Sequence, residues 1–127
     1  MTISRRAGRR AALFMLFQWD VTGKKLGTTY EGEADEFAWD TARAVADRAE
    51  ELDRRIDEAT EGWPADRLGA LERNVLRIAI HELEQGDVPP EVAIDEAVRL
   101  AKRYASDEAG KLVNGILGKI AREERTR

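Results

Sequence analysis

The amino-acid sequence predicts an all-α protein, and two observations support that prediction. With 43% hydrophobic and 36% charged residues but only 10 Gly and 3 Pro among 127 residues, the composition favours a globular helical fold. Apolar residues also recur at steps of three and four along most of the chain, the spacing that places side chains on one face of a helix. No segment alternates like a strand, and the length suits one domain spanning residues 1–127.

The first predicted helix begins after Ser4, because serine is a common helix N-cap. Its expected buried stripe is Ile3, Ala7, Ala11, Phe14, Phe17 and Val21.

The segment SRRAGRR places four arginines at the start of this helix, where the partial positive charge of the helix N-terminus disfavours them. They are Arg5, Arg6, Arg9 and Arg10. At about 100° per residue they fall within an arc of roughly 140° beside the apolar stripe, so we expect them to form one exposed patch. This costly placement favours an anion-binding surface over an ordinary solvated helix face.

A glycine-containing loop, TGKKLGTTYEGEA, is predicted next, followed by a periodic stretch long enough for two helices joined by a kink. The apolar stripe of that stretch is Phe37, Thr41, Val45, Arg48, Leu52, Ile56, Ala59 and Trp63. Pro64 and Gly69 then interrupt the helical pattern. We therefore expect an N-terminal helical subdomain over residues 1–63 and a C-terminal one over residues 64–127.

The second half predicts three more helices. ALERNVLRIAIHELEQG is apolar over more than half of its circumference, which is typical of a central helix, and Gly86 can cap its C-terminus. The next helix starts near Pro90 and the last one near Ser106. Gly115 lies inside the last helix at a cost of about 1 kcal/mol relative to Ala, so we expect a close helix contact there.

The residue types exclude most kinds of catalysis. The chain has no cysteine and one histidine, so it offers no recognisable catalytic, metal or cofactor site, and we predict that it is not an enzyme. It has no apolar run of membrane-spanning length and no recognisable signal peptide, which predicts a cytoplasmic protein without membrane contact.

Charge is segregated along the chain. The net charge is −4, yet the first ten residues carry four bases and no acid, whereas residues 31–66 hold thirteen acids against four arginines. Residues 102–127 are basic again. A local basic surface for nucleic acid is therefore compatible with an acidic protein.

Four segments resemble the NusB family of transcription antitermination factors in their order and spacing. They are SRRAGRRAALFMLFQWD, LERNVLRIAIHEL, DVPPEVAIDEAVRLAKRYA and GKLVNGIL. The resemblance implies two packed three-helix bundles, no catalysis and no cofactor. It also implies binding to the boxA element of nascent ribosomal RNA leaders, as single-stranded RNA, together with NusE, a small-subunit ribosomal protein, in an antitermination complex with RNA polymerase.

The resemblance also assigns residues to two surfaces. It places Arg5, Arg6, Arg9 and Arg10 at the RNA, with Lys111 and Asn114 beside them. It places Phe17, Val21 and Glu82 at the NusE interface. The chain departs from the family pattern at Gly8, where Ala is more usual and where we expect glycine to loosen the first helix, and at Gly118, where Asp is usual.

Two other functions remain open at this stage. One is a helical protein-interaction adaptor without an RNA role, and the other is the NusB-like RNA-binding module found in certain ribosomal RNA methyltransferases. The length argues against the second, because we expect no catalytic domain to follow. The sequence leaves open whether the free protein is a monomer or a homodimer.

Overall fold

The computed structural model describes residues 2–60 and 67–125, and every regular element in this part of the chain is a helix. The helices are α1 (Arg5–Thr22), α2 (Glu36–Asp47), α3 (Ala49–Thr60), α4 (Ala70–Gln85), α5 (Pro90–Tyr104) and α6 (Asp107–Arg125). The all-α prediction is confirmed, and so is the break of the periodic stretch into two helices, at Arg48. Trp63 and Pro64 lie outside the described residues.

Short polar side chains and glycines set the helix ends as predicted. The Ser4 hydroxyl accepts a hydrogen bond from the Ala7 amide at 3.1 Å, and the Ser106 hydroxyl accepts one from the Ala109 amide at 3.0 Å. Gly86 ends α4 with φ of 72°, a left-handed conformation that glycine adopts without strain. These contacts satisfy backbone groups that a helix end leaves unpaired.

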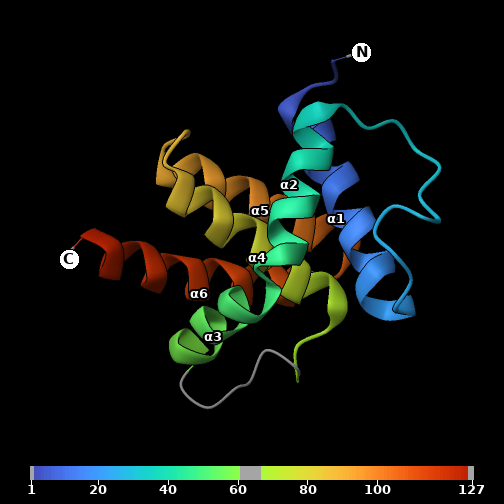
Figure 1. Cartoon of the computed structure of the whole chain (residues 1–127). Coiled ribbons are helices and arrows are strands. Elements are labelled where there is room, and N and C mark those ends of the chain that lie inside the picture. The colour runs from blue at the N-terminus through green and yellow to red at the C-terminus, as the bar shows by residue number, and fades with distance from the viewer. Residues whose placement is uncertain (1, 61–66, 126–127) are drawn as a thin grey trace.

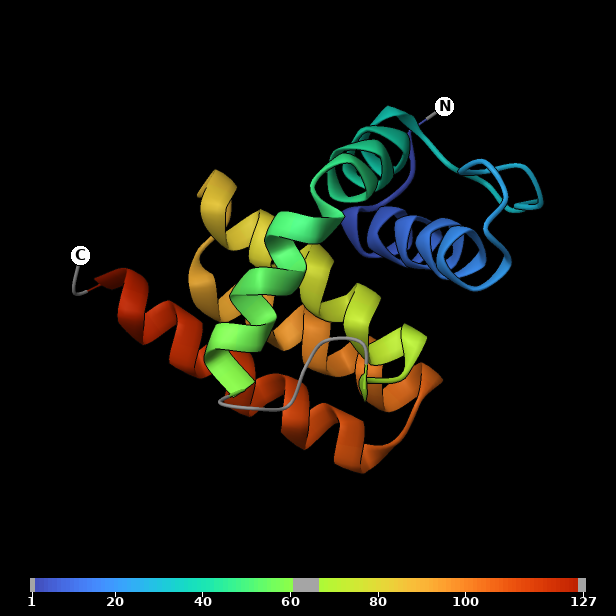
Figure 2. The same ribbon diagram turned by 60° about the horizontal axis from the view of Figure 1, so that its bottom comes forward.

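Helix α4 lies at the centre and packs against all five other helices (Figure 1). Helices α1 and α2 lie together on one side of it, whereas α3 packs against α4 and α6 (Figure 2). The predicted division of the chain near residue 63 stays a prediction. The largest fully buried side chains come from all helices except α5: Leu13, Met15, Leu16, Val45, Leu52, Ile56, Val75, Leu76, Ile80, Val113, Leu117 and Ile120.

The buried face of α1 differs from the predicted stripe. Val21 is 59% exposed, whereas Ala12, Leu13 and Met15 are fully buried. The prediction was wrong in part because α1 packs against both α2 and α4, which widens and turns its buried face.

The two helical glycines also differ from expectation. A Cβ at Gly115 would meet no atom within 4 Å, so the predicted close helix contact at this residue is wrong. A Cβ at Gly8 would lie only 2.7 Å from the Phe37 ring. Gly8 therefore permits the close approach of α2 to α1.

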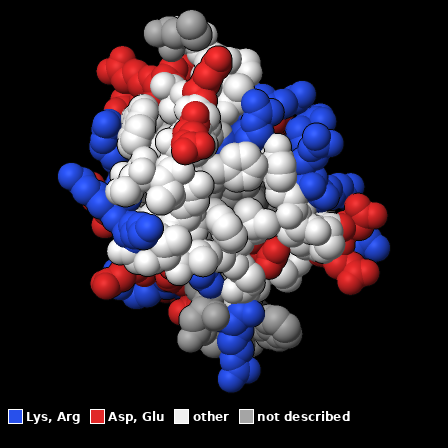
Figure 3. Space-filling view, turned by 90° about the vertical axis from the view of Figure 1, so that its right-hand side faces the viewer, with Lys and Arg blue, Asp and Glu red and all other residues white. Residues whose placement is uncertain are grey.

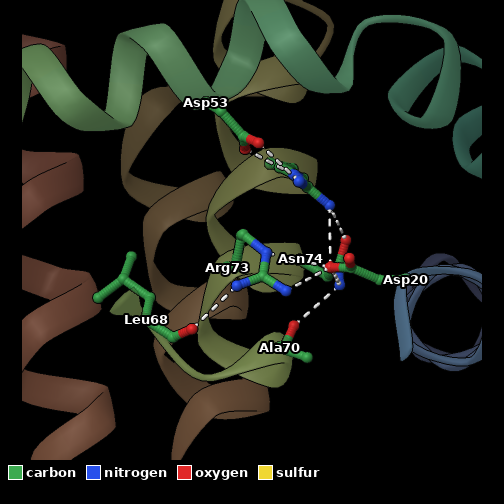
Figure 4. Close-up of polar contacts among 7 residues, drawn as sticks. Asp20, Asp53, Leu68, Ala70, Arg73 and Asn74 are labelled. Atoms are coloured by element: carbon green, nitrogen blue, oxygen red, sulfur yellow. Dashed lines mark hydrogen bonds and ion pairs between the residues drawn. The ribbon is translucent and has the colours of Figure 1, made fainter. Parts of the chain in front are cut away.

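A cluster of polar side chains joins three helices inside the fold (Figure 4). Asp20, at the end of α1, accepts hydrogen bonds from Arg73 at 2.8 Å, Asn74 at 3.0 Å and Arg77 at 3.1 Å, all on α4. Arg77 also donates to Asp53 of α3 at 2.7 Å. Nothing in the sequence pattern indicates this cluster, because Asp20 and Asp53 are far along the chain from the α4 residues that they contact.

No helix in the described ranges is long and apolar enough to cross a bilayer.

Candidate nucleic-acid interface

Three of the four predicted arginines are exposed at the start of α1. The guanidinium of Arg5 lies over the Phe37 ring, 4.0 Å from its centroid, a cation–π contact that anchors the side chain. Arg6 pairs with Glu96 of α5 at 2.9 Å while its side chain stays 56% exposed. Arg10 is exposed one turn further on. These side chains keep their positive charge at the surface.

Arg9 does not belong to this exposed patch. Its side chain is only 7% exposed and donates from Nε to Glu82 of α4 at 2.7 Å. Apolar side chains of α4 and α5, among them Ile78 and Ala93, cover one side of the pair, and its other side lines a cavity of about 580 Å³ between α1, α2 and α4. The prediction that all four arginines form one exposed patch is therefore wrong for Arg9, because the core of the fold lies under that side of α1.

Two arginines of α5 extend the basic surface. Two contacts join α1 to α5: Arg6 pairs with Glu96, and Phe14 meets Tyr104 edge to face. Between these contacts both chains advance by eight residues in the same direction. The two helices therefore run parallel along this border.

The pKa of the Glu96 carboxyl is lowered, mainly by the hydrogen bond from Arg6. The positive charges of Arg6, Arg9 and Arg99 add to this shift, and Arg99 lies one turn after Glu96 on α5. Arg103 follows one turn later, with its guanidinium 6.0 Å from the Tyr104 ring centroid.

We call Arg5, Arg6, Arg10, Arg99 and Arg103 the arginine surface. Figure 3 shows a group of Lys and Arg side chains at the upper right of the face that includes α1, others at its left border, and a broad area of uncharged side chains between them. The four-residue spacing of Arg99 and Arg103 is visible in the sequence and puts both on one face of a helix. Only the packing shows that this face adjoins α1.

A groove runs beside the arginine surface, between α1 and the segment that follows it. Its volume is about 540 Å³. It is lined by Ile3, Ala7, Arg10, Phe14, Gln18, Thr29, Tyr30, Glu31, Gly32 and Glu33. Burial raises the pKa of the Tyr30 phenol, and the nearby positive charge of Arg10 opposes that shift. The groove thus combines aromatic rings with an exposed guanidinium.

Lys111 and Asn114 are both exposed on α6, away from the start of α1 but close to the end of α5: a Cβ at Gly110, next to Lys111, would lie 2.6 Å from the Lys102 side chain. Lys111 lines a mainly apolar groove with Thr60, at the end of α3, and with Leu68. Figures 1 and 2 both show the end of α3 well apart from the start of α1. The expectation that Lys111 and Asn114 lie beside the arginines is therefore wrong.

The predicted partner residues are also separated. Val21 is exposed and Phe17 is half-buried on α1, as a protein-binding surface requires. Glu82, however, pairs with Arg9, and at about 1.5 Å per residue Arg9 lies roughly 18 Å along the helix from Val21. Glu82 is thus an internal partner of Arg9 and not an exposed carboxylate beside Val21.

Within residues 2–60 and 67–125, no group of three or more His, Cys, Asp or Glu side chains is arranged to hold a metal ion. His81 is half-buried, and its Nδ1 lies 3.0 Å from the Arg48 guanidinium. Burial, together with the positive charge of Arg48, lowers the pKa of His81. This favours the neutral imidazole, which accepts the hydrogen bond from Arg48.

Comparison with known proteins gives consistent matches over nearly the whole chain. The family model described as "NusB family" matches residues 6–122. A transcription antitermination protein NusB from Rubrobacter xylanophilus is 43% identical over 122 residues, which cover 91% of this chain and 88% of that protein.

Solved structures of related proteins have the same fold. T. maritima NusB has a TM-score of 0.83 and 38% identity, with 97% of this chain and 94% of that chain covered. A NusB crystallised with NusE and double-stranded RNA has a TM-score of 0.82 and 30% identity, with 94% of this chain and 96% of that chain covered.

Proposed function

The chain belongs to the NusB family, which consists of transcription antitermination factors and not of enzymes, and from this premise we propose a specific role. The protein binds single-stranded boxA-type RNA in nascent ribosomal RNA leaders together with NusE. The pair then joins the elongating RNA polymerase in the cytoplasm. The related complex of NusB, NusE and double-stranded RNA supports NusE and RNA as partners. The choice of single-stranded boxA RNA rests on the family resemblance.

The arginine surface is the observation that carries this proposal. Arg5, Arg6 and Arg10 remain at the surface although the start of a helix disfavours positive charge. Phosphates offset this cost, because each contact releases condensed counterions from the RNA. Arg99 and Arg103 lengthen the basic track along α5, in the direction that α1 also takes.

We assign NusE to the second half of α1. Val21 is a large apolar side chain that is 59% exposed, and Phe17 lies one turn before it. An exposed apolar patch suits a protein partner better than a polyanion. Lys111 and Asn114 remain candidates for RNA contacts made by a strand that extends beyond the arginine surface.

A salt titration of RNA binding tests the proposal. The triple variant Arg5→Gln, Arg6→Gln and Arg10→Gln is compared with a control triple variant that loses the same charge elsewhere, at Arg43, Arg54 and Arg67, all of which are exposed. Binding of boxA RNA is measured with and without NusE at several salt concentrations. We expect the first variant to bind more weakly and its slope of log affinity against log salt to flatten by about 0.7 for each lost phosphate contact.

Two controls accompany this titration. Light scattering on the same samples gives the oligomeric state and hence the molar concentration. The control variant should keep the parent slope. Equal slopes for all three proteins would contradict the assignment of phosphate to the arginine surface, and the absence of RNA binding by the parent chain, with or without NusE, would favour the adaptor without an RNA role.

A further inference from the structure

The groove between α1 and residues 29–33 has features that phosphate binding does not use. Phe14 and Tyr30 both line it, so two aromatic rings face one space next to the guanidinium of Arg10. At about 540 Å³ the groove falls within the roughly 300–1,000 Å³ typical of sites for small organic groups. A flat aromatic ligand fits such a space better than a phosphate does.

The structure holds both rings in place. Tyr104 of α5 contacts Phe14 edge to face, with ring centroids 4.9 Å apart. The Tyr30 hydroxyl donates a hydrogen bond to the Glu33 main-chain oxygen at 2.9 Å. The Thr29 hydroxyl donates to the Gln18 side chain at 2.9 Å, which ties the segment carrying Tyr30 back to α1. Because little freedom remains for these side chains to lose, a stacked ligand binds to a preformed surface.

The groove is continuous with the arginine surface through two side chains. Arg10 belongs to both, and Phe14 contacts Tyr104, beside which Arg103 lies. A strand whose phosphates follow Arg6, Arg10 and Arg103 therefore passes the mouth of the groove. Single-stranded RNA has unstacked bases that can turn away from the backbone into such a space.

We propose that this groove receives one unpaired base of the bound RNA, stacked on Phe14 and Tyr30, and that it contributes sequence preference which the arginines do not supply. This inference rests on the proposed function, because it needs an RNA strand on the arginine surface. It assigns α1 two tasks: Arg5, Arg6 and Arg10 hold the phosphates, and the groove reads a base.

The acidic residues of the groove indicate which bases it prefers. Glu31 and Glu33 are exposed at its rim, and a carboxylate accepts hydrogen bonds from the amino groups of guanine, adenine and cytosine. Uracil has no amino group, and the two carbonyl oxygens that flank its single N3–H donor would lie close to negative charge. The groove therefore favours an amino-bearing base over uracil, and the same carboxylates keep phosphates on the arginine side.

An abasic scan of the RNA with the parent protein tests the proposal without any change to the fold. A short boxA RNA is prepared in versions that each lack one base, and the affinity for each version is measured in the presence of NusE. We expect one position at which loss of the base weakens binding by roughly 5- to 150-fold, the range for loss of one stacked base. Uracil at that position should also bind more weakly than guanine, adenine or cytosine.

Variants of the groove then test whether it binds the base that the scan identifies. Tyr30→Leu should weaken binding of the intact RNA and remove its sensitivity to the abasic position, while the salt slope stays that of the parent because no phosphate contact is lost. Tyr30→Phe keeps the ring but loses the hydrogen bond to Glu33, so it should weaken binding less than Tyr30→Leu and keep the sensitivity to the abasic position. Phe14→Leu provides a second variant, and the melting temperature of each protein verifies folding.

The outcomes separate this inference from the proposed function. Strong RNA binding with unchanged affinity and unchanged abasic pattern in Tyr30→Leu would overturn the base site and leave the arginine surface intact. Loss of NusE binding in Tyr30→Leu, with RNA binding by the isolated protein unchanged, would assign the groove to the protein partner and overturn the inference. The salt slope of the arginine variant tests only the proposed function, because it reports phosphate contacts and not the stacked base.

Discussion

Arg9 and Glu82 form an ion pair whose surroundings decide its role. The two side chains are 7% and 12% exposed, and apolar side chains of α4 and α5 cover one side of them. A charge in such a place is tolerated only when it is paired, because its transfer from water is costly. The pair therefore holds α1 against α4, and its two charges are largely committed to each other.

We predict that Arg9→Met and Glu82→Leu each lower the free energy of unfolding by about 3 kcal/mol, because each leaves one charge buried without its partner. The double variant should recover most of that loss, since it removes both charges together. Urea unfolding of the four proteins measures these differences. If Arg9→Met leaves stability unchanged but weakens RNA binding, Arg9 is exposed in solution and belongs to the arginine surface after all.

At the scale of the helix, glycine has opposite roles in α1 and α6. At Gly115 of α6, a Cβ meets nothing within 4 Å, so the glycine only lowers helix stability. At Gly8 of α1, a Cβ would lie 2.7 Å from Phe37, whose ring also supports the guanidinium of Arg5. Gly8 thus allows two helices to approach and helps position a residue of the arginine surface.

We predict that Gly115→Ala raises the free energy of unfolding by about 1 kcal/mol, whereas Gly8→Ala gives no gain. At Gly8 the helix propensity of alanine is offset by displacement of the Phe37 ring. Thermal and urea unfolding measure both variants. Combining Gly8→Ala with Phe37→Leu should restore the gain, and an equal gain for Gly8→Ala and Gly115→Ala would show that Phe37 moves aside freely.

At the scale of the whole molecule, one polar cluster connects helices from both halves of the chain. Asp20 of α1 receives hydrogen bonds from three side chains of α4, and Arg77 continues the connection to Asp53 of α3 (Figure 4). Burial opposes ionisation of Asp20, but the hydrogen bonds from Arg73 and Asn74 outweigh it and lower the pKa of this carboxyl. The cluster fixes where α1 ends relative to α4, and so helps fix the direction of the arginine surface.

We predict that Asp20→Ala lowers the free energy of unfolding by about 3 kcal/mol, because Arg77, with a side chain only 6% exposed, loses one of its two carboxylates and the ion pair between Asp20 and Arg73 is also lost. Asp53→Ala should lower the free energy of unfolding by less, because the Asp53 side chain is more exposed, at 28%. In this variant Arg77 also keeps its ion pair with Asp20. Denaturant unfolding compares the two variants. A larger loss for Asp53→Ala would show that the connection to α3 matters more than the connection to α1.

The sequence by itself determined the helices and their ends. Ser4, Ser106 and Gly86 act on backbone groups within a few residues, so their roles follow from local chemistry. The division of the stretch after residue 36 into two helices was also predicted, but its position at Arg48 was not. The central position of α4 followed from the pattern, because a helix that is apolar on most sides must be surrounded.

The predicted stripe gave the buried face of α2 and α3, but only the tertiary structure decided which side chains at the edge of a buried face are covered, above all on α1. Arg9 and Arg10 are neighbours in the sequence, yet one is buried against Glu82 and the other is exposed. Arg103 joins the arginine surface only because α5 lies along α1. Burial, pairing and exposure depend on what packs opposite a side chain, and that neighbour comes from a distant part of the chain.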